Sequence, residues 1–110
     1  MKKILIDNLE WQAEDDGILR TWQEAMEYAS KLGDGWRLPT IEELISLIDF
    51  NTCNPACKIN NCRSSCYWSS SPYAHGSSYA WYVYFSGGYV SYGYKDFHYY
   101  ARCVRTIEEC

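Results

Sequence analysis

Two helix-start signals lie in the first half of the 110-residue chain, and they predict where helices begin. Thr21 is followed three residues later by Glu24, and Thr40 is followed by Glu43 at the same spacing. This is the capping-box pattern, in which the two side chains bond to free backbone amides of the first turn. Apolar residues recur at helical spacing after each threonine, and Gly33 stands where the first helix should end. We therefore predict two N-terminal helices, the second with apolar positions as far as residue 48.

The second half of the chain has the character of β-strands joined by turns. Residues 67–70 begin one strand, residues 79–85 form another, and a glycine-containing turn leads into a strand at 89–92. Residues 100–105 form a last strand, and residues 4–12 form a short strand or an extended arm. Helices followed by antiparallel strands predict an α+β fold. The length predicts a single domain over residues 1–110.

Tyrosine is concentrated in the last third of the chain. Ten of the eleven tyrosines lie in residues 67–100. A core gains apolar bulk more easily from Phe or Leu, because their side chains have no hydroxyl to satisfy. Tyrosine instead gives rigid, amphipathic contact area at a low entropy cost. The concentration therefore predicts a contact surface.

Strand alternation within this region separates two sets of side chains. Trp81, Val83 and Phe85 share one face of the predicted strand, and we interpret them as core. Tyr82 and Tyr84 share the other face, and we expect them to be exposed.

Charge and hydropathy exclude several classes of partner. The net charge is −4 and no basic stripe is present, so we expect no binding to nucleic acid. No apolar run approaches the length of a membrane span. The first residues resemble a signal peptide only until Asp7, so we see no export signal. We expect a cytoplasmic protein as synthesised, which could reach a virion or a cell surface through a partner.

Six cysteines are many for a chain of this length, and four of them lie in one polar segment, residues 51–66. These four are Cys53, Cys57, Cys62 and Cys66. Loops of about sixteen residues usually need a tether or a function. Four thiolates could hold zinc, disulfides could close the loop or join it to Cys103, or the thiols could be free. The spacing leaves these alternatives open, and we expect Cys110 to be unpaired.

Several motifs together resemble one known family. They are Gly35-Trp36-Arg37-Leu38-Pro39-Thr40 with Glu43-Leu44, Tyr67-Trp68-Ser69-Ser70-Ser71, Ala80-Trp81 with Phe85, and Arg102-Cys103-Val104-Arg105. Over about residues 15–105 the chain resembles the Lcl C-terminal domain family of collagen-like bacterial adhesins. The resemblance implies a C-type lectin-like fold, with two helices packed on a small antiparallel sheet, near the formylglycine-generating-enzyme-like group. The chain departs from the adhesins because it has no collagen-like repeats and has a cysteine-rich loop.

The resemblance also implies that some residues form a fixed framework, which presents other residues on a ligand-binding surface. Trp36, Leu38, Trp68, Trp81 and Val104 would form the framework of the fold. Three arginines would bind carboxylates and carbonyls within it, namely Arg37, Arg102 and Arg105.

Some members of this fold are variable proteins of diversity-generating retroelements. Adenine-directed mutagenesis of AAY codons can produce Tyr, Ser, His, Asp, Gly, Phe, Ala and several other residues, but not Trp, Lys, Glu, Gln or Met. The segment at about residues 73–99 interleaves such residues with others that resemble framework, such as Val90 and Lys95. Strands and turns are also rich in Tyr, Ser and Gly for ordinary reasons. The predicted ligand-binding surface consists of Tyr73, His75, Tyr82, Tyr84, Ser86, Tyr89, Ser91, Tyr92, Gly93, Tyr94, Asp96, Phe97, His98 and Tyr99.

We therefore predict a non-enzymatic binding module with a diversified, tyrosine-rich surface, whose partner is a protein or a surface glycan. One alternative is a fixed, adhesin-like domain that binds carbohydrate or glycosaminoglycan, although Lys95 is the only base on this surface. The other is a cysteine-dependent enzyme of the formylglycine-generating branch, which would depend on Cys103. No nucleophile elbow is present, and Asp15 and Asp16 are more typical of a turn than of a calcium site.

Overall fold

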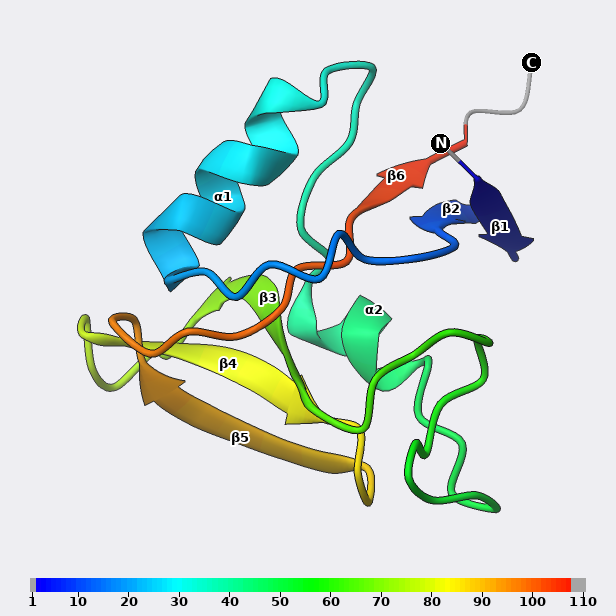
Figure 1. Ribbon diagram of the computed structural model, residues 1–110. Coiled ribbons are helices and arrows are strands. Elements are labelled where there is room, and N and C mark those ends of the chain that lie inside the picture. Colours follow the sequence, from blue (N-terminus) through cyan, green and yellow to red (C-terminus); the bar gives the residue numbers. More distant parts are fainter. Residues whose placement is uncertain (1, 108–110) are drawn as a thin grey trace.

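The structure, a computed structural model, describes residues 2–107 and contains two antiparallel three-stranded sheets (Figure 1). The first sheet brings together the two ends of the described chain, in the order β1 (Lys3–Ile6), β2 (Leu9–Gln12) and β6 (Val104–Thr106). The second sheet follows the chain, in the order β3 (Cys66–Pro72), β4 (Tyr79–Tyr84) and β5 (Tyr89–Tyr94). The helices of the described residues are α1 (Trp22–Lys31) and α2 (Ile41–Ile45). The α+β class predicted from the order of elements is confirmed.

Both capping boxes form, and each sets the start of its helix. The Thr21 hydroxyl accepts a hydrogen bond from the backbone of Glu24, whose carboxylate accepts one from the backbone of Thr21 in return. Thr40 and Glu43 make the same reciprocal pair. Gly33 follows α1 with a φ of +67°, a conformation that glycine adopts without strain.

The second helix is shorter than its apolar pattern predicted. It ends at Ile45, although Leu47 and Ile48 beyond it are both buried. The chain turns there and pairs with the following loop, because the Lys58 amide donates to the Leu47 carbonyl and Ile48 forms a bridge with Cys57. Beyond α2 the Leu47 and Ile48 amides donate to carbonyls three residues back, and the chain then pairs with the loop instead of continuing as an α-helix.

The two ends of the chain also differ from the prediction. Residues 3–12 form a β-hairpin, in which Ile4 pairs with Trp11, and not a single strand or arm. The last strand contains only Val104–Thr106, since Tyr100 instead bridges to Tyr67 of β3 in the parallel sense. This bridge pairs with part of the outer edge of β3, and within residues 2–107 β5 is the strand at the other edge of the sheet.

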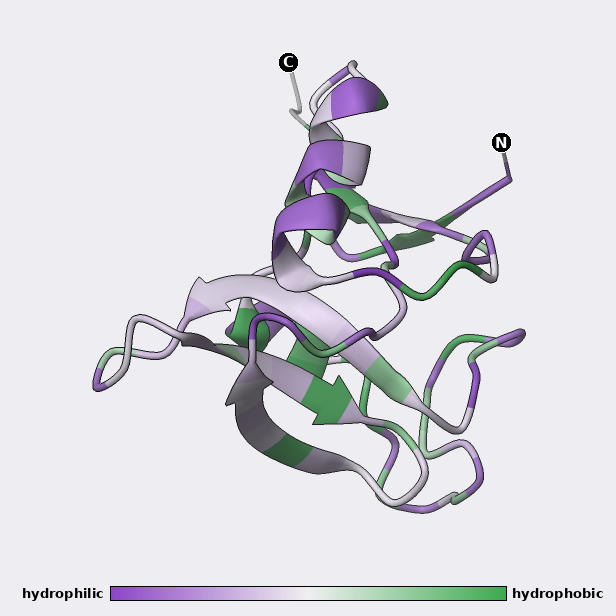
Figure 2. Cartoon of the chain, turned by 60° about the vertical axis from the view of Figure 1, so that its left-hand side comes forward, coloured by the Kyte–Doolittle hydropathy of each residue, from purple (hydrophilic) through white to green (hydrophobic). Residues whose placement is uncertain are grey.

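Two clusters of buried side chains form the core. One joins both sheets and α2, and it includes Trp11, Leu44, Tyr67, Val83 and Val104. The other lies beneath α1, whose outward turns are hydrophilic in Figure 2, and it includes Ala25, Ala29, Leu38, Trp68 and Ala80. Neighbouring residues of β3 therefore serve different clusters, as the alternation of a strand requires. No helix in the described part of the chain has the length and apolar character needed to cross a membrane.

The three framework arginines bind as the resemblance implied. Arg37 makes two hydrogen bonds to Glu43, at 2.7 and 2.9 Å, and they lower the pKa of that carboxyl. The Arg105 side chain donates to the Glu10 carboxylate at 2.6 Å. Arg102 is buried and donates to three backbone carbonyls. The contacts of Arg102 and Arg105 join segments that are far apart in the sequence.

Candidate functional site

A row of exposed and half-buried rings lies on one face of the β4–β5 hairpin. The strand register pairs Tyr79 with Tyr94 and Trp81 with Tyr92, so all four side chains project from the same face. Tyr73, just beyond β3, stacks on Tyr92 with ring centroids 3.9 Å apart and an angle of 15° between the planes. We call these five residues the aromatic strip. Tyr92 and Tyr94 are 45% and 50% exposed, so the strip presents aromatic area and hydroxyls to solvent.

Edge-to-face contacts hold the strip together. Tyr73 meets Trp81 at 5.3 Å between centroids, and Trp81 meets Tyr92 at 5.7 Å, both nearly perpendicular. His75 meets Tyr73 at 5.8 Å. Such contacts contribute beyond the area that they bury and restrict the rotamers of each ring. The strip is therefore ordered before any partner binds, which reduces the entropy cost of binding.

The prediction that Trp81 belongs to the core is wrong. Val83, on the same face, is fully buried against the cluster that contains α2, whereas Trp81 is only half-buried. A sheet face is buried only where another element covers it, and α2 covers only the end of this face near Val83. The alternation predicted which side chains share a face but not where that cover ends.

Tyr82 is also placed differently from the prediction. It is half-buried rather than exposed. Its ring centroid lies 6.3 Å from that of Trp68 and 4.7 Å from that of Tyr99. The opposite face of the hairpin is occupied at this point by the cluster beneath α1. Tyr84, two residues further on and past that cover, is 41% exposed as predicted.

Of the remaining predicted residues, His75 and Phe97 adjoin the strip, with ring centroids 5.8 Å from Tyr73 and 5.4 Å from Tyr94, whereas others lie elsewhere. Tyr84 and Tyr89 form a pair at the far end of the hairpin, with Tyr89 66% exposed. Ser86 in the turn donates to the Asn54 side chain at 2.8 Å. Ser91 is half-buried, and Val90, which was predicted as framework, is 39% exposed. The exposed residues after β5 are Asp96, Phe97 and His98.

Sequence reasoning missed two members of the strip, Tyr79 and Trp81. Counting outward from a four-residue turn at residues 85–88 pairs them with Tyr94 and Tyr92, and antiparallel partners share a face, whereas a turn at residues 86–88 would place each partner one residue away, on the opposite face. The register was therefore the available signal. The Lys95 ammonium, in contrast, lies 4.4 Å from the centre of the Trp22 ring, consistent with a framework role.

Gly93 is the one predicted surface residue that the structure buries. A Cβ at this position would lie 3.2 Å from atoms of both Phe97 and Tyr82, and 3.4 Å from the Tyr99 hydroxyl. Gly93 is therefore part of the packing beneath the hairpin and does not belong to the contact surface.

Gly93→Tyr is expected to lower the free energy of unfolding by about 1–3 kcal/mol, because the added ring overpacks this site. Ser91→Tyr is the matched control, since it lies on the same strand and is less buried. We expect it to change the free energy by less than about 1 kcal/mol. Urea denaturation followed by tryptophan fluorescence measures both variants. Equal losses would show that Gly93 has no special packing role.

The five described cysteines carry free thiols. The buried Cys62 thiol donates to the Arg63 carbonyl at 3.9 Å, Cys57 packs against the core cluster that contains Cys62, and Cys53 is exposed. Cys103 is fully buried in the other cluster and is not paired with the loop. Within residues 2–107 no three His, Cys, Asp or Glu side chains could together hold a metal ion. The zinc site stays a prediction that would require the loop to rearrange, and Cys110 lies outside the described residues.

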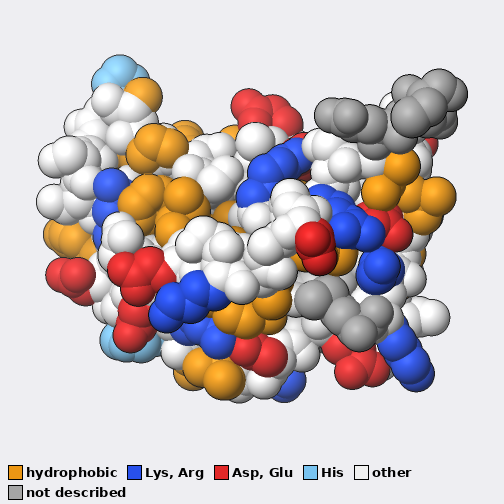
Figure 3. All heavy atoms as spheres, turned by 90° about the horizontal axis from the view of Figure 1, so that it is seen from above, with side chains coloured by type: hydrophobic (Ala, Val, Ile, Leu, Met, Phe, Trp, Pro, Cys, Tyr) orange, Lys and Arg blue, Asp and Glu red, His pale blue; other side chains and the backbone are white. Residues whose placement is uncertain are grey.

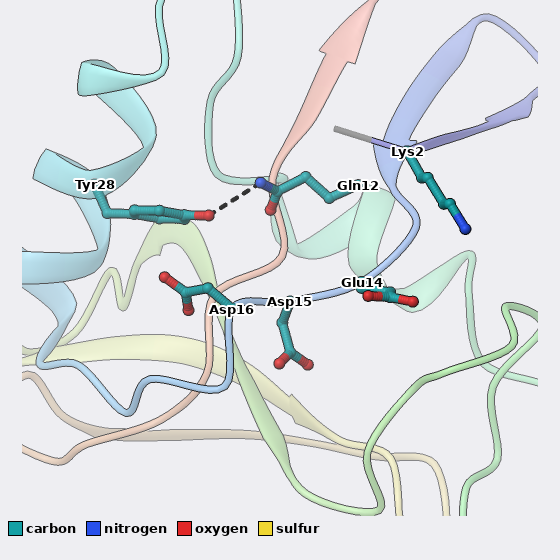
Figure 4. Close-up of a pocket in the computed structure, with 6 residues that line it drawn as sticks. All are labelled: Lys2, Gln12, Glu14, Asp15, Asp16 and Tyr28. Carbon is teal, nitrogen blue, oxygen red and sulfur yellow. Dashed lines mark hydrogen bonds between the residues drawn. The ribbon is translucent and has the colours of Figure 1, made fainter.

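A separate polar pocket of about 460 Å³ lies between β2 and α1 and contains three acidic side chains (Figure 4). Glu14, Asp15 and Asp16 point in different directions in this pocket. Asp16 binds Arg20 at 2.6 Å, and Asp15 accepts hydrogen bonds from Arg63 and from the Tyr67 hydroxyl. The carboxylates thus serve the fold, as the turn interpretation expected, and do not converge on a cation.

The architecture defines the class of protein. The described helices and antiparallel sheets form a C-type lectin-like fold, and the structure is similar to EMS16, an antagonist of the collagen receptor integrin alpha2beta1, with a TM-score of 0.65. That similarity covers 94% of this chain and 96% of EMS16 at 11% sequence identity. The Lcl C-terminal domain family matches residues 5–105, and the chain belongs to this family. None of the curated protein sequences matches it.

Proposed function

We propose that this chain is a non-enzymatic ligand-binding module and a variable protein of a diversity-generating retroelement. The aromatic strip is the observation that supports a binding role. Its rings lie at the protein surface, are ordered by one another, and rest on a buried scaffold. Exposed aromatic area of this kind is typical of surfaces that bind protein or glycan partners.

The pattern of exposure supports diversification. The exposed residues of the predicted surface belong to the set that adenine-directed mutagenesis allows, for example Tyr84, Tyr89, Tyr92 and Tyr94. The neighbouring residues outside that set are Trp81, which is half-buried, and Lys95, which packs on Trp22. Trp81 combines both roles, since it cannot arise by this mechanism yet supports the exposed rings. A fixed tryptophan that packs against variable tyrosines would give the same supporting contacts in each variant.

Two alternatives fit the structure less well. A glycosaminoglycan binder needs clustered bases, but Lys95 is engaged with Trp22, and on the face seen in Figure 3 basic and acidic side chains are interspersed. A cysteine-dependent enzyme would require access to Cys103. That thiol is fully buried, and burial raises its pKa to about 12, which disfavours the reactive thiolate.

Tolerance of the surface to substitution tests the proposal on the protein itself. The triple variant Tyr84→Ser, Tyr89→Asn, Tyr94→Asp is expected to stay within about 1–2 kcal/mol of the parent in free energy of unfolding, since these side chains are exposed. Val83→Asp, which puts a carboxylate into the core, should in contrast fail to fold stably. Urea denaturation measures both. Loss of folding in the triple variant would contradict a surface built to vary.

The DNA around the gene supplies a second, independent test. We expect a nearby reverse transcriptase gene and a near-copy of the DNA for residues 73–99, with differences confined to adenines. If neither is present, the retroelement role is wrong, and heparin or a glycan array then becomes the probe for a fixed adhesin-like domain.

A further inference from the structure

Within residues 2–107 the outer edge of β5 pairs with no other strand, and the proposed binding function does not use this edge. In Figure 1, β5 is the outermost strand of its sheet. Its pairing with β4 is regular over all six residues, Tyr89–Tyr94, and contains no bulge. An edge of this kind presents a row of backbone amides and carbonyls with which another strand can pair.

The other sheet edges in the described part of the chain are short, irregular or covered. β1 has only four residues and begins with the charged Lys3. The outer edge of β6 is bridged by Arg37, which pairs with Val104. β3 ends at Pro72 after a register shift and is bridged by Tyr100. Charged residues, prolines, bulges and short strands all oppose pairing with another chain, and β5 has none of these features.

The hydrogen bonds to β4 determine which backbone groups of β5 face outward. Just after the strand, the Lys95 amide donates to the Ser78 carbonyl at 2.9 Å, so the backbone of Lys95 faces the β4 side. Along an antiparallel strand, this direction alternates from one residue to the next. The backbone groups of Val90, Tyr92 and Tyr94 therefore point away from β4, toward the outer edge.

We propose that the outer edge of β5 is a self-association surface, at which two copies of this chain pair β5 with β5 about a two-fold axis at Tyr92. The strands run antiparallel and join the two β3–β4–β5 sheets into one continuous sheet. The Tyr92 amide of each copy donates to the Tyr92 carbonyl of the other, and the Tyr94 amide donates to the Val90 carbonyl. The Tyr94 carbonyl already accepts from the Phe97 amide, and its second lone pair accepts from the Val90 amide of the other copy.

The side chains of β5 match themselves in this register, which is why the occupant is a second copy. Hydrogen-bonded partners share a face, so Tyr92 lies beside Tyr92 of the second copy, and Val90 beside Tyr94. Aromatic pairs and pairs of aromatic with β-branched residues are favourable across strands. Val90, Tyr92 and Tyr94 are 39%, 45% and 50% exposed in the single chain, so their contact removes apolar area from water.

Charge does not oppose this pairing, although the whole chain carries a net charge of −4. No acidic or basic residue lies in β5, so no like charges face each other across the axis. Lys95, just beyond the strand, faces Tyr89 of the second copy, and its ammonium packs on the Trp22 ring.

Self-association would also change how the aromatic strip meets a ligand. A two-fold axis perpendicular to the sheet leaves both strips on the same face of the joined sheet. Tyr92 and Tyr94 belong to the strip, so the two strips would adjoin along the paired strands. The dimer would therefore present two copies of the same contact surface to one partner, which raises avidity.

The experiment measures the full chain alone, under reducing conditions, by sedimentation and by amide hydrogen exchange over a range of concentrations. We expect the mass to double as the concentration rises. The amides of Val90, Tyr92 and Tyr94 should exchange quickly in the monomer and about tenfold more slowly when the protein is mostly dimer, because exchange then requires dissociation. The amides of Ser91 and Gly93 face β4 and should not change, so they are the internal control.

Opposite charges at Tyr92 test the axis directly. Tyr92→Lys and Tyr92→Glu each place like charges opposite one another, so each should raise the dissociation constant of its own dimer by about tenfold or more. An equal mixture of the two variants should form a heterodimer, because the charges then attract. Tyr84→Lys and Tyr84→Glu are the matched controls, since Tyr84 is 41% exposed on β4 and lies away from this edge. These controls should dimerise as the parent does.

Three outcomes would overturn the proposal. The first is a monomer at every concentration, which would leave the edge to an extended segment of another protein. The second is a dimer in which the amides of Val90, Tyr92 and Tyr94 still exchange quickly, since another surface would then hold it together. The third is dimerisation of Tyr92→Lys or Tyr92→Glu alone as readily as the parent. Because the exchange measurement needs no variant, poor folding of one of them does not prevent the test. None of these outcomes decides whether the aromatic strip binds a ligand.

Discussion

Replacing Arg102 with alanine is expected to lower the free energy of unfolding by about 3–5 kcal/mol, the range seen when a buried charged group loses its partner. Arg102 is 1% exposed and donates to the carbonyls of Gln12, Ala13 and Asn61 at 2.8–3.0 Å. Its removal leaves these acceptors without their cationic donor. It also removes the cation that lies 3.9 Å from the carboxylate of Asp15, which is itself buried.

Arg63→Ala is the matched control for Arg102→Ala. Arg63 binds the same Asp15 carboxylate, at 3.0 Å, but its side chain is 47% exposed. Exposed ion pairs contribute little, so we expect a loss of less than about 1 kcal/mol. Urea denaturation followed by fluorescence compares the two variants. Similar losses would show that Arg102 does not hold the three segments together.

Trp68→Ala is expected to lower the free energy of unfolding by about 3–5 kcal/mol, as for other buried aromatic residues cut back to alanine. The side chain is fully buried, and its indole nitrogen donates to the Arg20 carbonyl at 2.9 Å. Its ring packs on Tyr99 and Tyr82, at 4.7 and 6.3 Å between centroids. The substitution leaves a cavity beneath α1 and an unpaired carbonyl.

Trp81→Ala is the control for Trp68→Ala. It also tests whether Trp81 contributes more to ligand binding than to the stability of the fold. Trp81 is half-buried within the aromatic strip, so we expect a loss of stability less than half of that for Trp68→Ala. It should nevertheless reduce affinity for any protein or glycan selected against the parent surface, since Tyr73 and Tyr92 pack on its ring. Thermal denaturation and a binding titration measure the two effects. If Trp81→Ala unfolds the chain as readily as Trp68→Ala, the distinction fails.

The predictions that depend on short sequence motifs were confirmed. The capping boxes at Thr21 and Thr40 form because each joins groups only three residues apart. The family motifs predicted the C-type lectin-like fold because they record where buried tryptophans and arginines recur along the chain. The arginine contacts to carboxylates and carbonyls followed from the same motifs.

The predictions that failed concern which neighbour covers each side chain. Trp81 and Val83 share one face of β4, yet only Val83 lies where α2 covers that face. Gly93 belongs to an exposed strand, yet Phe97 and Tyr82 close over it. Neither outcome follows from alternation, because alternation says nothing about the length of the covering element.

By itself the sequence determined the start of each helix, the α+β order, the family and the concentration of tyrosine near the C-terminal end. These features depend on residues within a few positions of one another or on motif composition. Only the tertiary structure decided that five rings form one strip, and that Cys57 and Cys62 pack with one core cluster and Cys103 with the other. Those contacts depend on strand register and on how distant segments pack, since burial is a property of the assembled chain and not of any single segment.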